Sequence, residues 1–508
     1  MDRQIRRLGL ALVALFLLLV GQVSNLQVFA ADRIANDPAN ARRQLIAEYR
    51  VDRGSILAAD GVTVLAMSRK SRGELVFLRR YPDGPLYAGI TGFYSQVFGR
   101  TGLEFSMNPF LSGDAAELTT QTLSDLVLGR PKKGGTVVTT IVPELQEVAE
   151  RALAEALPEN GSGAVVALNP QTGDVLSMVS IPTFDPNPLS SQEDDLIRST
   201  WDRYNEDPAR PLVNRAVGEL YPPGSTFKLI TASAALEHGA TLDTTYPNPH
   251  ELDLPLTTQT IENFGGGFCP GGSTTTLLTA FTNSCNVIFG EIGLQLGPER
   301  LAEQARAFGF CATNPPDQTD CQEPTVPFTI PFQSGSFPVP EYFQGRDPAV
   351  AISAIGQDND LANPMQMALV GAAIANGGIE MAPRLVTQVR DAQGQVVKRF
   401  QPSIFGRPIS SSTASAMTRM MVNVVAVGTG QDAQIPGITV AGKTGTAQQG
   451  EGVAPHAWFV SFAPAENPQI VVAVVVLDGG NLGSEATGGH VAAPIAKQII
   501  EAYVGAGG

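Results

Sequence analysis

The stretch Tyr221–Lys228, with the sequence YPPGSTFK, constrains the fold more than any other part of this chain. Its two prolines and its glycine keep the backbone out of a helix, and a mostly apolar run follows over residues 229–238. Gly239 then ends that run in the manner of a helix C-terminus. We therefore expect a buried helix that begins at Ser225 and carries Lys228 on the same face.

A serine and a lysine in this arrangement can form a nucleophile and its base. A serine hydroxyl needs a neighbour that accepts its proton, and a lysine desolvated at a buried helix end is such a base. The free N–H groups of a helix N-terminus also favour an oxyanion nearby. The Ser-x-x-Lys spacing alone is a weak signal. However, only seven lysines occur in the chain, and only Lys228 has a serine three residues before it.

Two further motifs follow in order, Ser284-Cys285-Asn286 and Lys443-Thr444-Gly445-Thr446-Ala447. Taken singly, the first can be a helix cap and the second a strand end with a turn. Together with Ser-x-x-Lys, and in this order, they match the motif set of penicillin-binding proteins and serine β-lactamases. The combination indicates serine acyl transfer far more strongly than any one motif does.

The composition excludes several other classes of function. A net charge of −15 over 508 residues argues against nucleic acid as a partner. The four histidines lie far apart in the sequence and no metal-binding motif is present, so we expect neither a metal nor another cofactor.

The four cysteines, Cys269, Cys285, Cys311 and Cys321, show no C-x-x-C spacing. An even count in an exported protein allows up to two disulfides, and three connectivities are possible. Cys311 and Cys321 flank a short loop and form one candidate pair. The alternative is that all four are free and buried. No histidine adjoins Cys285 in the sequence, so we interpret it as the variable middle residue of its motif and not as a nucleophile.

The N-terminus predicts a membrane segment. Arg3, Arg6 and Arg7 precede an apolar stretch over residues 8–23, which predicts a cytoplasmic N-terminus and an extracytoplasmic remainder. Residues 26–31 extend this stretch to spanning length, although Val28-Phe29-Ala30 also fits a cleavage site. We expect an uncleaved anchor, with a cleaved signal peptide as the alternative.

We divide the rest of the chain into two domains, after a cytoplasmic tip and anchor over residues 1–31. Residues 32–156 form a mixed N-terminal pedestal that resembles a dimerisation domain. Its acidic residue of interest is Glu104, for which a structural salt bridge between the domains is the preferred interpretation. Residues 157–508 form the second domain, which contains all three motifs.

The second domain is predicted to be α/β, of the α+β type. Two strands lie near its start, over 163–168 and 175–179, and three lie near its end, over 438–442, 457–462 and 470–476. The middle is helical, including a segment that opens at Ser284 and ends near Gly293, and a last helix spans about 491–504. This order predicts one central, mainly antiparallel sheet that is built from both ends of the domain and flanked by helices.

The chain resembles the class B penicillin-binding proteins, and among them the actinobacterial penicillin-binding protein A group. The resemblance covers nearly everything after the anchor. Besides the three motifs, it rests on matching segments at 87–95, 214–216, 354–357, 364–368 and 457–459. It implies a β-lactamase-like transpeptidase fold, peptidoglycan stem peptides as substrates and β-lactams as inhibitors. By analogy, a SEDS-family glycan polymerase is a candidate partner of the first domain.

The resemblance also implies a role for each motif residue. Ser225 attacks the penultimate D-Ala carbonyl and Lys228 accepts its proton. Ser284 relays a proton to the leaving amine, and Asn286 holds the substrate amide and Lys228. Lys443 supplies positive charge, while Thr444, Gly445 and Thr446 belong to the strand that binds the substrate carboxylate. The backbone N–H groups of Ser225 and Thr446 would form the oxyanion hole.

Several alternatives remain on sequence alone. A D,D-carboxypeptidase differs only in using water as the acceptor. A serine β-lactamase needs a base for deacylation, and no clear Glu-x-x-Leu-Asn element lies between Asn286 and Lys443. A bifunctional glycosyltransferase is disfavoured because the region before Leu157 is too short. A non-catalytic scaffold is disfavoured because every motif residue is intact.

Overall fold

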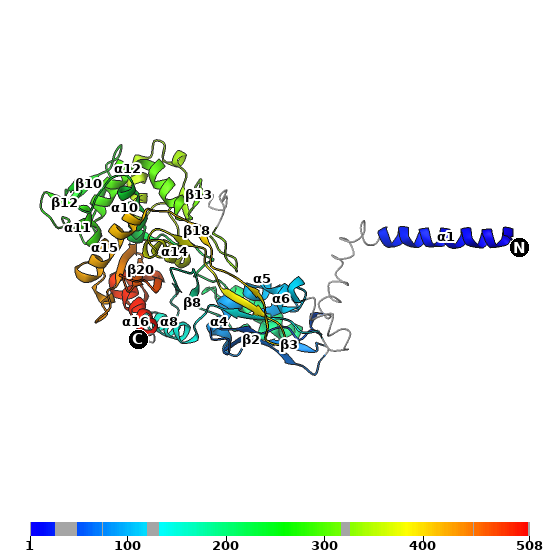
Figure 1. Ribbon diagram of the computed structural model, residues 1–508. Helices are drawn as coiled ribbons and strands as arrows, with labels where there is room; N and C mark the ends of the chain where they lie inside the picture. The colour runs from blue at the N-terminus through cyan, green and yellow to red at the C-terminus, as the bar shows by residue number, and fades with distance from the viewer. Residues whose placement is uncertain are drawn as a thin grey trace.

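The computed structural model describes residues 2–25, 48–73, 75–118, 132–315, 326–450 and 452–505. Figure 1 shows the first region of the chain, mainly in blue, beside a larger body that contains the three sequence motifs, in green to red. The helix α1 (Asp2–Ser24) includes the one segment of the described residues that is long and apolar enough to span a membrane, Arg6–Ser24. The predicted extension over residues 26–31 lies outside the described residues.

The larger body is built on a five-stranded antiparallel sheet in the order β19-β20-β21-β7-β8. As predicted, the sheet takes two strands from the start of the domain and three from its end. The strand bounds are β7 Gly163–Leu168, β8 Val175–Ile181, β19 Ala441–Ala447, β20 His456–Ala463 and β21 Ile470–Val476. The expected strand over 438–442 begins only at Ala441 and continues through the Lys443 motif.

Both faces of this sheet are covered, which explains why β21 is apolar at every position. Alternate residues of the central strands belong to different cores: Val166 and Ala473 pack with the helical middle of the domain, whereas Val165 and Val474 pack with the two helices α8 and α16. This alternation follows from the two-residue period of a strand. The flanking helices are α8 Pro143–Glu155, α10 Lys228–Glu237, α12 Asn286–Ala307, α13 Asp347–Ser353, α14 Pro364–Ala375, α15 Ser411–Val427 and α16 Ala493–Gly505.

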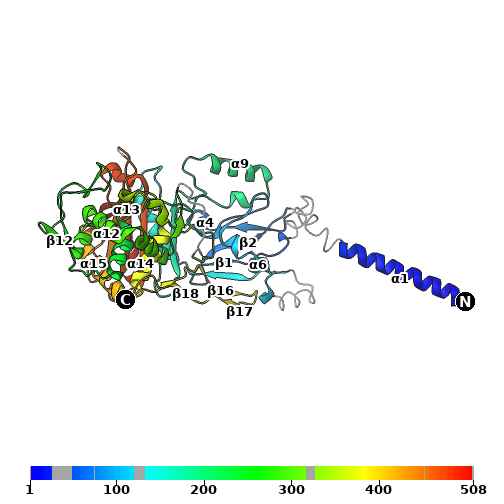
Figure 2. The ribbon, with the colours of Figure 1, turned by 90° about the horizontal axis from the view of Figure 1, so that it is seen from above.

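The first region contains a second sheet, of six strands in the order β17-β16-β6-β1-β2-β3. Four of these strands come from the start of the chain, but β16 and β17 come from residues 386–399. Strand β16 pairs with β6, and Val389 lies opposite Val137. Figure 2 shows β16 and β17 in the same region as β1, from which β6 separates them in the sheet. The chain therefore returns to the first region after the helical middle, which the sequence analysis did not anticipate. The bounds are β1 Ile56–Leu57, β2 Val64–Lys70, β3 Phe77–Arg80, β6 Thr136–Thr139, β16 Val386–Arg390 and β17 Val396–Arg399.

Glu104 is fully buried in the first region, where it lies between two arginines. The Nε atom of Arg53 is 2.7 Å from its Oε2 atom, and Arg79 pairs with its Oε1 atom. The salt bridge is structural, as expected, but it joins parts of one region. The prediction that it links two domains is wrong, because Arg53, Arg79 of β3 and Glu104 all lie within residues 32–156.

The remaining helices and strands of the described residues are mostly short. They are α4 Gly84–Thr91, β4 Tyr94–Ser95, β5 Gly99–Arg100, α5 Gly102–Ser106, α6 Asn108–Leu111, α9 Asp194–Glu206, β9 Thr245–Pro247, β10 Glu251–Asp253, β11 Thr260–Glu262, β12 Thr274–Thr276, α11 Leu277–Thr282, β13 Cys311–Thr313, β14 Ser336–Pro338, β15 Glu380–Met381 and β18 Ile404–Gly406.

Candidate active site

Ser225 lies in a single 3-10 turn, Gly224–Phe227, that leads directly into α10. The predicted helix start is confirmed, and the helix ends at Glu237, two residues before Gly239. Gly224 has φ = 51°, and a Cβ atom there would lie 2.8 Å from the backbone oxygen of Thr446. The glycine therefore lets the Ser225 turn approach strand β19.

Ser284 and Asn286 lie at the junction of α11 and α12. Ser284 has φ = 58°, which is uncommon for a residue other than glycine and is typical of strained functional positions. Asn286 is the first residue of α12. The predicted end of this helix near Gly293 is wrong: helical backbone continues to Ala307, with a break at Gly297 before Pro298. The break occurs where glycine takes φ = 76° and proline removes an N–H donor.

Lys228 is completely buried and contacts the second motif. Its Nζ atom lies 2.7 Å from the backbone oxygen of Ser284, 2.7 Å from Oδ1 of Asn286 and 3.4 Å from Oγ of Ser284. Among the hydrogen bonds of the described residues, none joins Lys228 to Ser225. A neutral amine has two N–H donors and one lone pair. The two short contacts use both donors, so the lone pair remains available for the proton of Ser225.

Lys443 reaches the same cluster from strand β19. Its Nζ atom lies 2.7 Å from Oγ of Ser284 and 3.0 Å from the backbone oxygen of Thr444. Because Lys443 is also fully buried, Ser284 lies between two desolvated amines. Burial lowers the pKa of Lys443 to about 7. Burial, and then the nearby Lys443, lower the pKa of Lys228 well below its usual range. A neutral Lys228 is therefore favoured, as a general base requires.

The rest of the Lys443 motif forms the edge of the site. A Cβ atom on Gly445 would lie 2.9 Å from the backbone oxygen of Pro223, so only glycine permits the close contact between β19 and the Ser225 turn. The hydroxyl of Thr444 lies 2.6 Å from that of Thr429. Thr446 is half-buried and lines the cavity together with Ser225.

A disulfide joins Cys269 to Cys285 and ties the Ser284 motif to the segment before it. Cys311 is also in a disulfide. The alternative in which all four cysteines are free is therefore wrong, and the Cys269–Cys285 pair was not singled out from the sequence. The predicted partner of Cys311, Cys321, lies outside the described residues.

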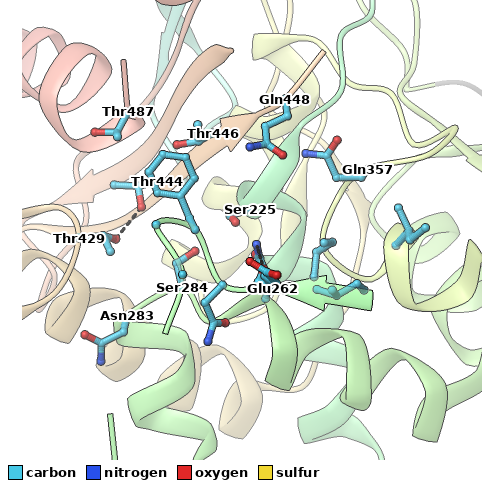
Figure 3. Close-up of a pocket in the computed structure, with 18 of the residues that line it drawn as sticks. Ser225, Glu262, Asn283, Ser284, Gln357, Thr429, Thr444, Thr446, Gln448 and Thr487 are labelled. Atoms are coloured by element: carbon cyan, nitrogen blue, oxygen red, sulfur yellow. Dashed lines mark hydrogen bonds between the residues drawn. The ribbon is translucent and has the colours of Figure 1, made fainter. Parts of the chain in front are cut away.

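All three motifs open onto one cavity of about 1070 Å³. Figure 3 shows Ser225 and Ser284 at its base, with Thr429, Thr444, Thr446 and Thr487 together on one side. The sequence analysis did not predict that several other residues line this cavity, because they belong to no motif that could be recognised in the sequence. These residues are Glu262, Asn283, Thr429, Gln448, Thr487 and His490. Within the described residues, no group of three or more potential metal ligands is present.

Comparisons with known proteins agree with this geometry. Residues 163–501 match the penicillin-binding protein transpeptidase domain family, and residues 53–137 match the penicillin-binding protein A dimerisation domain. The chain is 40% identical, over 99% of both chains, to the peptidoglycan D,D-transpeptidase PbpA of Mycolicibacterium smegmatis. The PbpA of Mycobacterium tuberculosis is 39% identical over the same share of both chains.

Solved structures give the same result. The ceftriaxone acyl-enzyme complex of penicillin-binding protein A from M. tuberculosis superposes with a TM-score of 0.82 at 38% identity, covering 90% of this chain and 99% of that one. The penicillin G acyl-enzyme complex of the same protein has a TM-score of 0.79 at 38% identity, covering 89% and 99%. By its catalytic motifs, its fold and its relatives over the full length, this chain belongs to the penicillin-binding protein family of transpeptidases.

Proposed function

We propose that this protein is a serine-type peptidoglycan D,D-transpeptidase that cross-links stem peptides and is inhibited by β-lactams. One observation supports this proposal above the others. The side chains of Lys228, Ser284, Asn286 and Lys443, from three motifs far apart in the sequence, are joined by direct contacts. Ser284 and Asn286 line the same cavity as Ser225. Relatives of 39–40% identity carry the same function in their names.

In the first half of the reaction, Ser225 Oγ attacks the carbonyl carbon of the penultimate D-Ala. Its proton passes to the lone pair of neutral Lys228, and a tetrahedral oxyanion forms. The peptide C–N bond then breaks, and the proton travels through Ser284 to the leaving amine of the terminal D-Ala. The position of Ser284 Oγ between the two lysine amines supports this relay. Apo hydrogen bonds in active sites are often long and tighten with substrate, which accounts for the absent Ser225–Lys228 bond.

The remaining motif residues bind the substrate. Asn286 both accepts a hydrogen bond from Lys228 and lines the cavity, where it can hold the substrate amide. Thr444 and Thr446 present hydroxyls to the substrate carboxylate, while Gly445 allows β19 to approach the nucleophile. The backbone N–H groups of Ser225 and Thr446 serve as oxyanion donors. Loss of one such donor typically raises a barrier by about 2.7–4 kcal/mol.

In the second half, an amine from another stem peptide attacks the acyl carbon and releases Ser225. Water in place of the amine would give a D,D-carboxypeptidase, and rapid hydrolysis of a β-lactam acyl-enzyme would give a β-lactamase. The β-lactam acyl-enzyme complexes solved for the M. tuberculosis relative favour a stable adduct.

The first region and the N-terminal helix fit a membrane-bound synthase. The helix over Arg6–Ser24 indicates a single-pass anchor, and we propose a cytoplasmic N-terminus from the three arginines around its start. We keep the division near Leu157 for the two domains, with 386–399 returning to the first sheet. A SEDS-family glycan polymerase remains our proposed partner for the first region.

Intact-mass analysis after addition of penicillin tests the proposal directly. The native extracytoplasmic part should gain one penicillin mass that persists for minutes or longer, and Ser225→Ala should gain none. An adduct that disappears within seconds while penicillin is consumed would indicate a β-lactamase. A folded native protein that forms no adduct would indicate a scaffold.

A further inference from the structure

The wall of the cavity opposite the threonines carries a single carboxylate, that of Glu262. Among the described lining residues it is the only acidic side chain, and it is exposed to solvent. Figure 3 labels Glu262 among the residues that line the cavity, together with Ser225 and Ser284. Its carboxylate forms no ion pair within the part of the chain that the structure describes. A charged group in the cavity without an ionic partner is a candidate for substrate recognition.

The backbone around Glu262 is fixed to the catalytic machinery. Nδ2 of Asn286 donates to the backbone oxygen of Glu262 over 3.1 Å, and the N–H of Val287 donates to Oδ1 of Asn263 over 3.1 Å. Strand β11, which ends at Glu262, is thereby attached to the start of α12. The backbone position of Glu262 is consequently tied to the same residue that accepts a hydrogen bond from Lys228.

Burial distinguishes Glu262 from its neighbour on the same strand. Ile261 is buried, and its side chain and that of Leu252 lie where a Cβ on Gly290 of α12 would contact them. Ile261 and Glu262 both line the cavity, but only Glu262 is exposed. Its carboxylate is therefore accessible to a substrate group that enters the cavity.

The charges of the site identify the chemistry that Glu262 would recognise. The pKa values of the two lysines are lowered by burial, so the cluster beneath the cavity carries less positive charge than two ordinary lysines would. The threonine wall suits the substrate carboxylate. The opposite wall, with a free carboxylate, suits a cation. D,D-transpeptidation requires an amine acceptor, and an alkyl amine is an ammonium ion at neutral pH.

We propose that Glu262 is a specificity residue that binds an ammonium group of the stem-peptide substrate. This inference depends on the proposed transpeptidase function and adds to it the charge of the substrate. The ammonium can belong to the attacking acceptor or to a side chain of the donor peptide, and two arms of one experiment distinguish these sources.

The experiment compares the native protein with Glu262→Gln and with Glu251→Gln. Glu251 is the cross-strand partner of Glu262 on β10, is also exposed, and does not line the cavity, so it controls for the loss of one negative charge from the same hairpin. Urea unfolding of all three proteins checks that the variants are folded. Acylation of Glu251→Gln by penicillin is expected to stay within about twofold of the native rate, because Glu251 does not line the cavity.

The donor arm measures D-Ala release from a stem peptide with a free side-chain ammonium and from the same peptide after acetylation of that amine. The acceptor arm uses the acetylated donor and varies the concentration of an amine acceptor. A charge-assisted contact predicts that Glu262→Gln loses roughly 10- to 100-fold in kcat/KM in one of the two arms, mainly through KM. Glu251→Gln should match the native protein, and Glu262→Asp should recover part of the loss.

Equal losses in Glu251→Gln and Glu262→Gln would overturn the inference, because they would reflect the general field of the hairpin. The inference would also be overturned if the native protein is active and Glu262→Gln has the same kcat/KM as the native protein in both arms. That outcome would leave the proposed transpeptidase function intact. A native protein that accepts penicillin but processes no stem peptide in either arm would instead contradict the proposed function, together with the inference that depends on it.

Discussion

Two buried charged clusters in this molecule are built on opposite principles. In the first region, Glu104 is enclosed by Arg53 and Arg79, so opposite charges meet without water. In the candidate active site, Lys228 and Lys443 meet around the hydroxyl of Ser284, and no carboxylate of the described residues pairs with either amine. The first arrangement keeps its groups charged, because each buried charge is stabilised by an opposite charge. The second favours neutral amines, because no opposite charge offsets the cost of burying an ammonium group.

The pKa shifts express this difference. Burial by itself would raise the pKa of Glu104, but Arg79 and Arg53 outweigh it and the pKa is lowered. Burial lowers the pKa of both lysines, and nothing in the cluster reverses the shift. A buried charge with partners is thus a structural element, and a buried basic group without an acidic partner is a reactive one.

The largest expected effect is that of Lys228→Met on activity. Loss of the base should slow acylation by penicillin by roughly 10³- to 10⁴-fold, at the upper end of what general base catalysis typically contributes. The free energy of unfolding should change little. The desolvation cost of a buried amine is removed, but the hydrogen bonds from Lys228 to Ser284 and Asn286 are lost. Stopped-flow acylation and urea unfolding measure the two quantities. A variant that retains native acylation rates would refute the role of Lys228.

The reverse outcome is expected in the first region for Glu104→Gln. This change leaves two buried guanidinium groups without their carboxylate, which typically costs about 3–5 kcal/mol of unfolding free energy. Urea unfolding should show this loss, while penicillin acylation of the folded variant stays near native. The matched control is Glu117→Gln, which removes a carboxylate from the solvent-exposed pair with Lys398 and should have little effect. Similar stability of both variants would contradict the structural role of Glu104.

The last expected effect is the pH dependence of stability, which is small for each single pH step. The pKa of Lys443 is about 7 in the folded protein and about 10.4 when unfolded. Between these values the unfolded chain binds more protons, so stability should rise with pH by up to about 1.4 kcal/mol per pH unit and level off outside the window. Glu104 acts in the opposite range: its lowered pKa contributes stability that is lost only as the pH falls below about 4.3.

Urea unfolding of the native protein and of Lys443→Met between pH 7 and 10 tests this contrast. In Lys443→Met, the slope of unfolding free energy against pH should be smaller by the equivalent of up to one bound proton. Glu104→Gln should keep the native slope in this pH range. An identical slope in Lys443→Met and the native protein would show that Lys443 remains fully charged in the folded state.

The parts of the site that were predictable are those encoded over a few residues. The Pro-Pro-Gly turn and the following apolar run predicted a helix start at Ser225, which lies in the 3-10 turn that leads into α10. The segment 470–476 was predicted to be a strand, and it forms β21, which is buried at every position. In both cases the local backbone preference and the burial pattern agree, so nearby residues suffice to specify the conformation.

The errors came from contacts between distant segments. Strands β16 and β17 join β6 across more than two hundred residues, and Cys269 pairs with a cysteine of the Ser284 motif. Neither the periodicity of apolar residues nor strand propensity indicates which segment a given strand pairs with, because the edge of a sheet can accept any strand of suitable pattern. The extension of α12 beyond Gly293 was missed because tertiary packing stabilises a helix through weak local signals.

The sequence by itself determined the chemistry of this protein: the three motifs, their order and the helix that begins at the nucleophile. Only the tertiary structure decided how the chemistry is tuned. The neutral state of Lys228 depends on burial and on Lys443, which lies 215 positions away in the chain. The backbone oxygen of Glu262 accepts a hydrogen bond from Asn286, which connects strand β11 with α12 at the cavity. Motifs specify which groups react, but desolvation and orientation arise only when distant segments pack together.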